Sequence, residues 1–106
     1  MQNLKQLLPI GSVILLKGME KKIVIIGAMP VVRTKANNHI AYDYLGVPYP
    51  EGFMDLDKSL LFMHEDIIEV VFEGYTDKER EFYIGALSEL IAETNAVVNS
   101  AEPQAE

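Results

Sequence analysis

Two aliphatic runs near the start of the chain predict buried β-strands. The first occupies residues 13–17 and begins Val-Ile-Leu-Leu, and the second occupies residues 21–27 as Lys-Lys-Ile-Val-Ile-Ile-Gly. Both are apolar at consecutive positions and rich in β-branched side chains, which is typical of strands covered on both faces. Because only a short polar turn separates them, we expect a β-hairpin. Met29 and Pro30 then interrupt the pattern, which predicts a bend, a bulge or an edge position.

Alternation of apolar and polar residues predicts two further strands. Ile40, Tyr42 and Tyr44 recur at every second position, which places them on one face of a third strand. The stretch Ile-Ile-Glu-Val-Val-Phe-Glu at residues 67–73 alternates in the same way, and it predicts a half-buried strand whose glutamates face water. Residues 55–66 fit a short strand and a helical turn equally well.

The C-terminal third of the chain predicts one long amphipathic helix. Thr76 and Glu79 have the spacing of a capping box, in which each side chain bonds the backbone amide of the other residue. Beyond them, side chains at spacings of three and four form one stripe on a helix of about five to six turns. The stripe consists of Tyr83, Leu87, Leu90, Ile91, Thr94 and Val98.

The order of these elements predicts an α+β fold. The strands follow one another by short links, without the long crossovers that a parallel sheet requires. We therefore expect a small antiparallel sheet or partial barrel with the long C-terminal amphipathic helix packed on its open face. We expect a single α+β domain at residues 1–99 and a disordered polar tail at residues 100–106. One helix covers only one face, so either the sheet curls on itself or a second copy of the chain covers the other face, as a homodimer.

Composition and charge narrow the range of partners. The chain of 106 residues contains no cysteine, which excludes disulfides and thiolate chemistry. Residues 1–53 carry six basic and three acidic side chains, whereas residues 54–106 carry three basic and thirteen acidic ones. An acidic half of this kind is repelled by phosphate backbones, so we expect no nucleic-acid partner. The apolar runs are too short for a signal peptide or a membrane span, so we expect a cytoplasmic protein without membrane insertion.

The polar residues carry little sign of catalysis. The sequence contains no glycine-rich phosphate loop and no serine in a nucleophile elbow. His64, Glu65 and Asp66 are metal-ligand types, but consecutive side chains diverge on a helix or a strand and do not converge on one ion. We expect His64 or Asp66 to bond the backbone that leads into the next strand, and we expect no enzymatic activity, no metal and no cofactor. A small metal- or ligand-dependent enzyme centred on these three residues is the less favoured alternative.

The stretch Asp-Tyr-Leu-Gly-Val-Pro-Tyr-Pro-Glu-Gly at residues 43–52 is the candidate binding segment. Val47 and Tyr49 both precede prolines, which biases them toward extended conformations. A preordered Val-Pro-Tyr-Pro segment loses little entropy on binding, and nothing in the local pattern buries Tyr49. We therefore predict a protein-binding site at Val47, Pro48, Tyr49 and Pro50. The alternative is a rigid connector whose tyrosine packs back on the domain.

Four stretches, in this order, resemble a known bacterial family: LLPIGSVILLKG, KKIVIIG, YDYLGVPYPEG and VFEGY. Over about residues 7–90 the chain is similar to the small Firmicutes family catalogued as domain of unknown function 4176, whose members are typically encoded near type VII secretion components and LXG toxins. The resemblance implies an accessory, adaptor or chaperone-like role, with an LXG toxin or a small helical type VII secretion protein as partner. It implies no catalytic residue. The alternative is an immunity protein whose acidic half covers a toxin domain.

Overall fold

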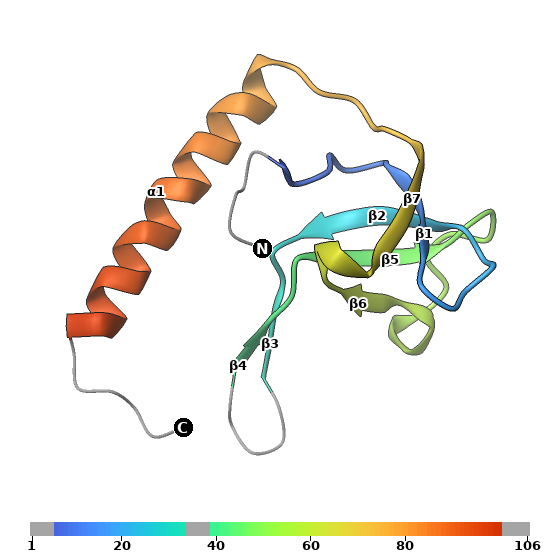
Figure 1. The fold of residues 1–106 in the computed structure, drawn as a ribbon, viewed down its shortest axis with the longest axis horizontal. Coiled ribbons are helices and arrows are strands. Elements are labelled where there is room, and N and C mark those ends of the chain that lie inside the picture. Colours follow the sequence, from blue (N-terminus) through green and yellow to red (C-terminus); the bar gives the residue numbers. More distant parts are fainter. Residues whose placement is uncertain (1–5, 34–38, 101–106) are drawn as a thin grey trace. The chain divides into compact units, whose positions relative to one another are not determined.

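The computed structural model of the protein describes residues 6–33 and 39–100, with side chains at residues 6–30 and 39–90. The chain divides after Tyr75 into two compact units. The first unit consists of β-structure with short helical turns, and the second contains a long helix (Figure 1). No helix among the described residues is long and apolar enough to cross a membrane. The expected single domain at residues 1–99 stays a prediction.

The described part of the first unit contains strands in two antiparallel sheets (Figure 1). They are β1 (Val13–Leu16), β2 (Ile23–Ala28), β3 (Val31–Arg33), β4 (His39–Ala41), β5 (Tyr44–Pro48), β6 (Leu60–Phe62) and β7 (Ile67–Phe72). The larger sheet has five strands in the order β6-β5-β2-β1-β7, and the smaller sheet pairs β3 with β4. A five-stranded antiparallel sheet and a C-terminal helix confirm the predicted α+β class.

The two aliphatic runs form the predicted hairpin. Ile14 of β1 lies opposite Ile23 of β2 in antiparallel register. The connection passes through Gly18, whose φ of +74° lies in the left-handed region that glycine adopts without steric cost. Both strands are interior to the sheet, because β1 also pairs with β7 and β2 also pairs with β5. Burial alternates along both strands, with Ile14, Leu16, Ile23 and Ile25 buried and Ile26 40% exposed, so one face is covered and the other only in part.

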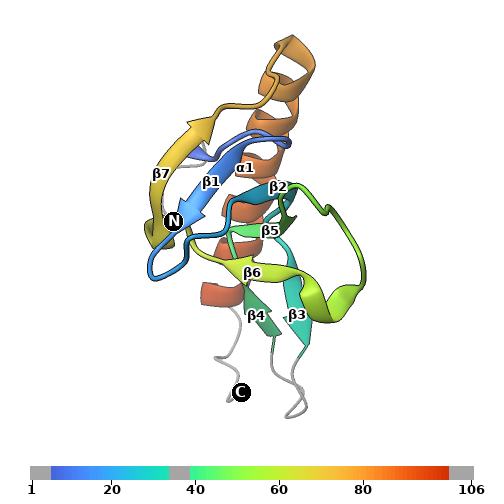
Figure 2. The same cartoon turned by 90° about the vertical axis from the view of Figure 1, so that its right-hand side faces the viewer.

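The five-stranded sheet is curled into a partial barrel. Its edge strands, β6 and β7, are consecutive in the chain and are joined through a 3₁₀-helix at His64–Asp66. In a flat five-stranded sheet the two edges would be about 19 Å apart, whereas only four residues join β6 to β7, and three of them form a 3₁₀-helix that rises about 2 Å per residue. The sheet must therefore bring its edges toward each other, and β7 follows a curved path beside β1 (Figure 2).

The predicted third strand is wrong, because the chain changes sheets between β4 and β5. The chain also changes sheets between β2 and β3. This change occurs at Met29, whose φ is +57°, and at Pro30, where the sequence predicts a bend. The Met29 N–H donates to the Asp43 carbonyl at 2.9 Å and holds the two bends together. In consequence Tyr44 is fully buried, whereas Ile40, two residues before the bend, is 42% exposed.

β7 departs from the predicted alternation at two β-bulges. Opposite the four residues of β1 it places Phe72, Val70, Glu69 and Ile67, so that Val71 and Ile68 are extra residues. Each inserted residue reverses the face on which the following side chains lie. Val70 therefore lies on the face of buried Ile14, and Phe72 lies on the opposite face. The expected half-buried face is wrong, since Ile68, Val70 and Phe72 are 59%, 46% and 61% exposed.

The core of the first unit is aliphatic and aromatic. Its buried apolar side chains are Leu7, Ile14, Leu16, Ile23, Ile25, Tyr44, Val47 and Phe62. The rings of Tyr44 and Phe62 stack with their centroids 5.4 Å apart. Gly46 lies against this cluster, and a Cβ at that position would be 2.5 Å from Cγ2 of Ile23 and 3.0 Å from Cε1 of Phe62. Only glycine fits there without movement of the core.

The ambiguous segment at residues 55–66 contains both of the alternatives that its sequence fits. A 3₁₀-helix at Leu56–Lys58 precedes β6, and a second 3₁₀-helix at His64–Asp66 follows it. A short strand and helical turns therefore occur side by side in this segment.

The second unit contains α1 (Lys78–Ser100). The Oδ1 atom of Asp77 accepts a hydrogen bond from the Arg80 N–H at 3.0 Å, which makes Asp77 the N-cap. The predicted capping box at Thr76 and Glu79 is therefore wrong by one residue. Aspartate is at least as good an N-cap as threonine, and its negative charge is stabilised by the positive end of the helix dipole.

The apolar stripe predicted for this helix is exposed in part. Tyr83 and Leu90 are 55% and 58% exposed, and Leu87 is half-buried. Ile84, one position from the stripe, is the buried apolar residue of the described half, at 8% exposure. The side chains of Ile91, Thr94 and Val98 lie outside the described residues, as do residues 101–106 of the tail expected at residues 100–106. The expected packing of the helix on the sheet stays a prediction.

Candidate protein-interaction surface

The predicted binding segment begins inside the sheet. Val47 lies opposite Val24 of β2, and Pro48 lies opposite Ile23. Val47 is only 3% exposed and belongs to the core, while Pro48 is half-buried at the end of β5. A partner therefore has little access to the first half of the segment Val47–Pro50.

The second half of the segment forms an anchored turn. The Tyr49 N–H donates to the Lys22 carbonyl at 2.9 Å, and the Gly52 N–H donates to the Pro48 carbonyl at 2.7 Å. The peptide bond between Tyr49 and Pro50 is cis, and Gly52 has a φ of +78°. Tyr49 is 48% exposed. The backbone of the turn is thus fixed by hydrogen bonds while the tyrosine ring faces solvent.

An ion pair fastens this turn to the connection between β1 and β2. Lys21 Nζ lies 2.7 Å from one carboxylate oxygen of Glu51 and donates to the other at 3.0 Å. The hydrogen bond from Lys21, followed by one from the Glu51 backbone N–H, lowers the pKa of the Glu51 carboxyl. Both side chains are nearly half exposed, so the pair contributes little to stability and mainly restricts the position of the turn.

The residues after the turn carry large apolar side chains into solvent. Phe53, Met54 and Leu56 are 59%, 47% and 79% exposed. The backbone here is ordered by Asp55, whose Oδ1 accepts from the Lys58 N–H at 3.1 Å and caps the short 3₁₀-helix. We refer to Tyr49, Phe53, Met54 and Leu56 together as the 49–56 surface.

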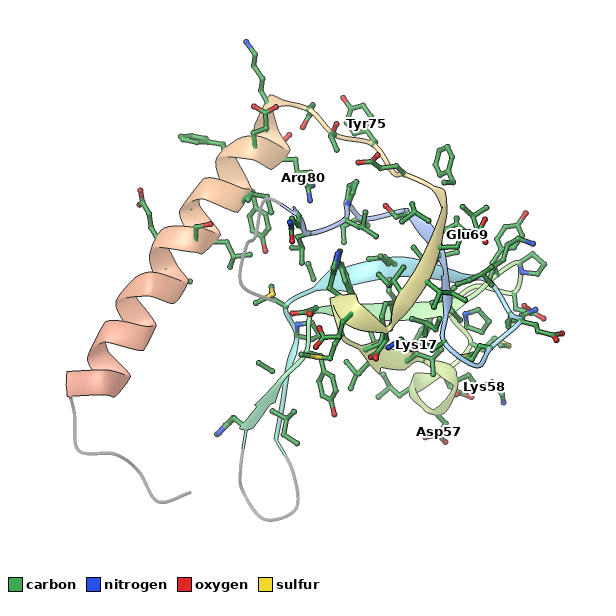
Figure 3. The ribbon with its side chains drawn as sticks, viewed as in Figure 1. Lys17, Asp57, Lys58, Glu69, Tyr75 and Arg80 are labelled. Carbon is green, nitrogen blue, oxygen red and sulfur yellow. The ribbon has the colours of Figure 1, made fainter. Side chains whose placement is uncertain are left out.

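The 49–56 surface combines features found at protein interfaces. Isolated exposed apolar residues are ordinary, but a group of large apolar and aromatic residues rimmed by charge is typical of a docking site. Carboxylates at Glu51, Asp55 and Asp57 alternate with these side chains along the segment. Asp57 and Lys58 mark the end of this loop in Figure 3.

The predicted binding segment shares only Tyr49 with the 49–56 surface, and its role as a binding site stays a prediction. The segment includes Tyr49, which is exposed, and Val47, which is buried. Exposure of Phe53, Met54 and Leu56 was not predicted, because residues 55–66 fit two kinds of structure and no periodicity separated buried from exposed positions. The signal in the sequence was the pair Phe53-Met54 directly after Gly52, where a turn residue is followed by large apolar residues and then Asp55.

His64 is part of a hydrogen-bonded structural network. Its Nδ1 lies 2.7 Å from the hydroxyl oxygen of Tyr44, and that oxygen also accepts from the Leu8 N–H at 2.9 Å. Which of the two groups donates depends on the tautomer of the imidazole ring. The network joins the N-terminal segment, β5 and the 3₁₀-helix before β7.

The other polar residues near His64 hold backbone groups. The His64 N–H donates to Oδ2 of buried Asp43 at 2.7 Å, and the Met63 N–H donates to Oδ2 of Asp66 at 3.1 Å. The predicted local role of Asp66 is confirmed, since its carboxylate closes the turn that leads into β7. Among the described residues, no three histidine or acidic side chains are grouped so that they could hold a metal ion.

Comparison with known proteins yields one family. The model of the family described as Domain of unknown function (DUF4176) matches residues 7–82, which include every described strand of the first unit and the first residues of α1. No curated protein and no solved structure matches the chain.

Proposed function

The chain belongs to the DUF4176 family, and from this premise we propose that it is a non-enzymatic protein-binding factor whose partner docks on the 49–56 surface. The observation that carries the proposal is the exposure of Tyr49, Phe53, Met54 and Leu56 on a loop whose backbone is fixed. A preordered apolar loop loses little entropy on binding, so its exposed area contributes directly to affinity.

The partner that we propose is an LXG toxin or a small helical type VII secretion protein. This part of the proposal is supported by the sequence resemblance described above. In this role the protein acts in the cytoplasm as an adaptor or chaperone-like factor before export of the toxin. An amphipathic helix of the partner is a suitable occupant, because helices bind through apolar side chains one turn apart.

Co-purification tests the proposal. The tagged protein is expressed in cells with the whole set of neighbouring genes, and the proteins that it retains are identified. The double variant Phe53→Ser/Leu56→Ser is compared with the control Ile10→Ser, which alters an apolar side chain that is 53% exposed outside this surface. We expect retention of a partner by the wild type and the control, and loss by the double variant. Recovery of no neighbouring protein, or equal recovery by all three, would contradict the proposal.

A second candidate function is that of an immunity protein. The observation that favours it is the absence of lysine and arginine from residues 59–77, a stretch that contains Glu65, Asp66, Glu69, Glu73 and Asp77. An acidic surface of this kind suits a basic toxin domain. Co-expression separates the two functions: an immunity protein restores growth to cells that express the toxin domain alone, whereas an adaptor binds the targeting region at the N-terminus of the toxin.

A further inference from the structure

β7 is an edge strand that carries exposed apolar side chains. Within the described part of the chain it pairs only with β1, and it ends the strand order of the larger sheet. Ile68, Val70, Val71 and Phe72 are 59%, 46%, 43% and 61% exposed. β6, the other edge, is half as long and exposes Leu61 at 37%. The six-residue strand β7 is therefore the longer and more apolar of the two edges, and such an edge is a template for another strand.

The charged side chains on β7 and next to it along the chain are acidic, although Lys17, which follows β1, lies beside the start of the strand, where its backbone N–H donates to the Asp66 carbonyl. Residues 59–77 contain no lysine or arginine. The exposed acidic residues on the strand and near its ends are Glu65, Glu69 and Glu73, and the half-buried Asp66 directly precedes the strand. Glu69 lies in the middle of β7, as the labelled side chains in Figure 3 show. A ligand that lies along this strand must therefore place its charged side chains beside carboxylates.

A second copy of β7 is a poor occupant of this edge. Two antiparallel copies would bring the glutamates of one strand close to those of the other, and like charges on paired strands are destabilising. The two bulges also bend the strand and oppose a flat pairing with an identical edge. The chain's own residues 101–106 are equally unsuitable, since they carry two glutamates and no basic residue.

We propose that β7 binds an extended segment of a partner protein in which apolar residues alternate with lysine or arginine. The apolar side chains of the segment lie on the face of Val70, and the basic ones lie on the opposite face beside Glu69. Backbone pairing supplies affinity, and the alternation of side chains supplies specificity. The inference rests on the proposed protein-binding function but uses a surface separate from the 49–56 surface.

Peptide binding to the full-length protein tests this inference. The probes are two soluble ten-residue peptides labelled with a fluorophore, one alternating valine and lysine and the other alternating valine and glutamate. Fluorescence anisotropy gives the affinity, and amide hydrogen exchange locates the binding site. We expect the lysine peptide to bind, to protect the amides of β7, and to weaken as salt is raised. The glutamate peptide is expected not to bind.

A charge exchange distinguishes recognition from nonspecific attraction. The variant Glu69→Lys/Glu73→Lys should weaken the lysine peptide by at least about tenfold and should gain binding of the glutamate peptide. The control variant Glu20→Lys/Asp57→Lys makes the same charge change at exposed positions away from β7 and should leave the affinity within about twofold.

Three outcomes would overturn the inference. The first is equal weakening of the lysine peptide in both charge variants, which would indicate nonspecific attraction to an acidic protein. The second is protection of β6 or of the 49–56 surface in place of β7. The third is concentration-dependent dimerisation with protection of β7 in the absence of peptide. None of these removes the 49–56 surface as a docking site, whose test uses Phe53 and Leu56.

Discussion

β5 and β7 are two apolar strands of the same sheet with opposite exposures. β5 has a neighbour on each side, and its residues Tyr44, Gly46 and Val47 are buried. Among the described residues β7 has a neighbour on one side only, and five of its six residues are exposed. β7 contains more large aliphatic side chains than β5, so hydrophobicity alone does not decide which strand forms the core, and position in the sheet and the two bulges do. An apolar strand is therefore evidence of a core only when its place in the sheet is known.

The largest expected effect comes from a matched pair of phenylalanines. Phe62 is 4% exposed and stacks on Tyr44, whereas Phe72 in β7 is 61% exposed. Phe62→Ala should lower the free energy of unfolding by about 3–5 kcal/mol, because it removes buried area and leaves a cavity. Phe72→Ala should lower it by less than about 1 kcal/mol. Denaturant unfolding of both variants measures the difference, and equal losses would show that β7 is covered.

Replacement of glycine by alanine should change stability in opposite directions in the two units. Gly46→Ala places a methyl group 2.5 Å from Ile23 and 3.1 Å from the Val24 carbonyl, so it should destabilise by about 1–3 kcal/mol. Gly85→Ala in α1 meets no atom within 4 Å and should stabilise the helix by about 0.5–1 kcal/mol. Circular dichroism during thermal unfolding reports both changes. A neutral Gly46→Ala variant would contradict the close approach of β5 to the core.

Removal of one hydroxyl tests the polar network behind β5. Tyr44→Phe leaves the ring in place but removes the oxygen that accepts from Leu8 and contacts His64. The variant should lose about 1–3 kcal/mol, since the Leu8 amide and the imidazole are both left without this partner. The control Tyr83→Phe removes a hydroxyl from a ring that is 55% exposed and should change stability by less than about 0.5 kcal/mol. Equal small changes would indicate that water replaces the Tyr44 hydroxyl.

The smallest expected effect concerns the ion pair at the turn. The pKa of Glu51 is lowered in the folded protein, so its contribution to stability is present above the ordinary carboxyl pKa and is lost as pH falls through the lowered value. NMR titration of the Glu51 side chain should give a pKa below 4.5, and Lys21→Met should raise it toward 4.5. An unchanged titration in Lys21→Met would show that the pair does not persist in solution.

Sequence patterns predict the strands that obey a simple rule and miss those that break one. The hairpin of β1 and β2 follows from two aliphatic runs and a glycine turn, and the class follows from the short links. The change of sheet between β4 and β5 could not be predicted, because Ile40, Tyr42 and Tyr44 keep a spacing of two across the bend. The bulges at Ile68 and Val71 could not be predicted either, because a bulge depends on the register with β1, which the local sequence does not show.

The candidate surface could be predicted only in part. The two prolines around Tyr49 indicate a stiff segment, and the structure anchors that segment through Lys22 and Gly52. Val47 is buried in the sheet, where it lies opposite Val24 of β2. Val24 is 23 residues earlier in the chain, so the sequence around Val47 does not show this pairing. Exposure of Leu56 likewise depends on the 3₁₀-helix that Asp55 caps. Long-range pairing and local caps, rather than composition, divide this segment into core and surface.

The most direct test of the account measures stability and partner binding on the same variant. Phe53→Ser/Leu56→Ser removes two exposed side chains of the 49–56 surface and is compared with wild type by thermal unfolding and by retention of proteins encoded beside the gene. We expect an unchanged melting temperature and loss of the retained partner. Full retention of the partner, or a melting temperature lowered as far as that of Phe62→Ala, would contradict it.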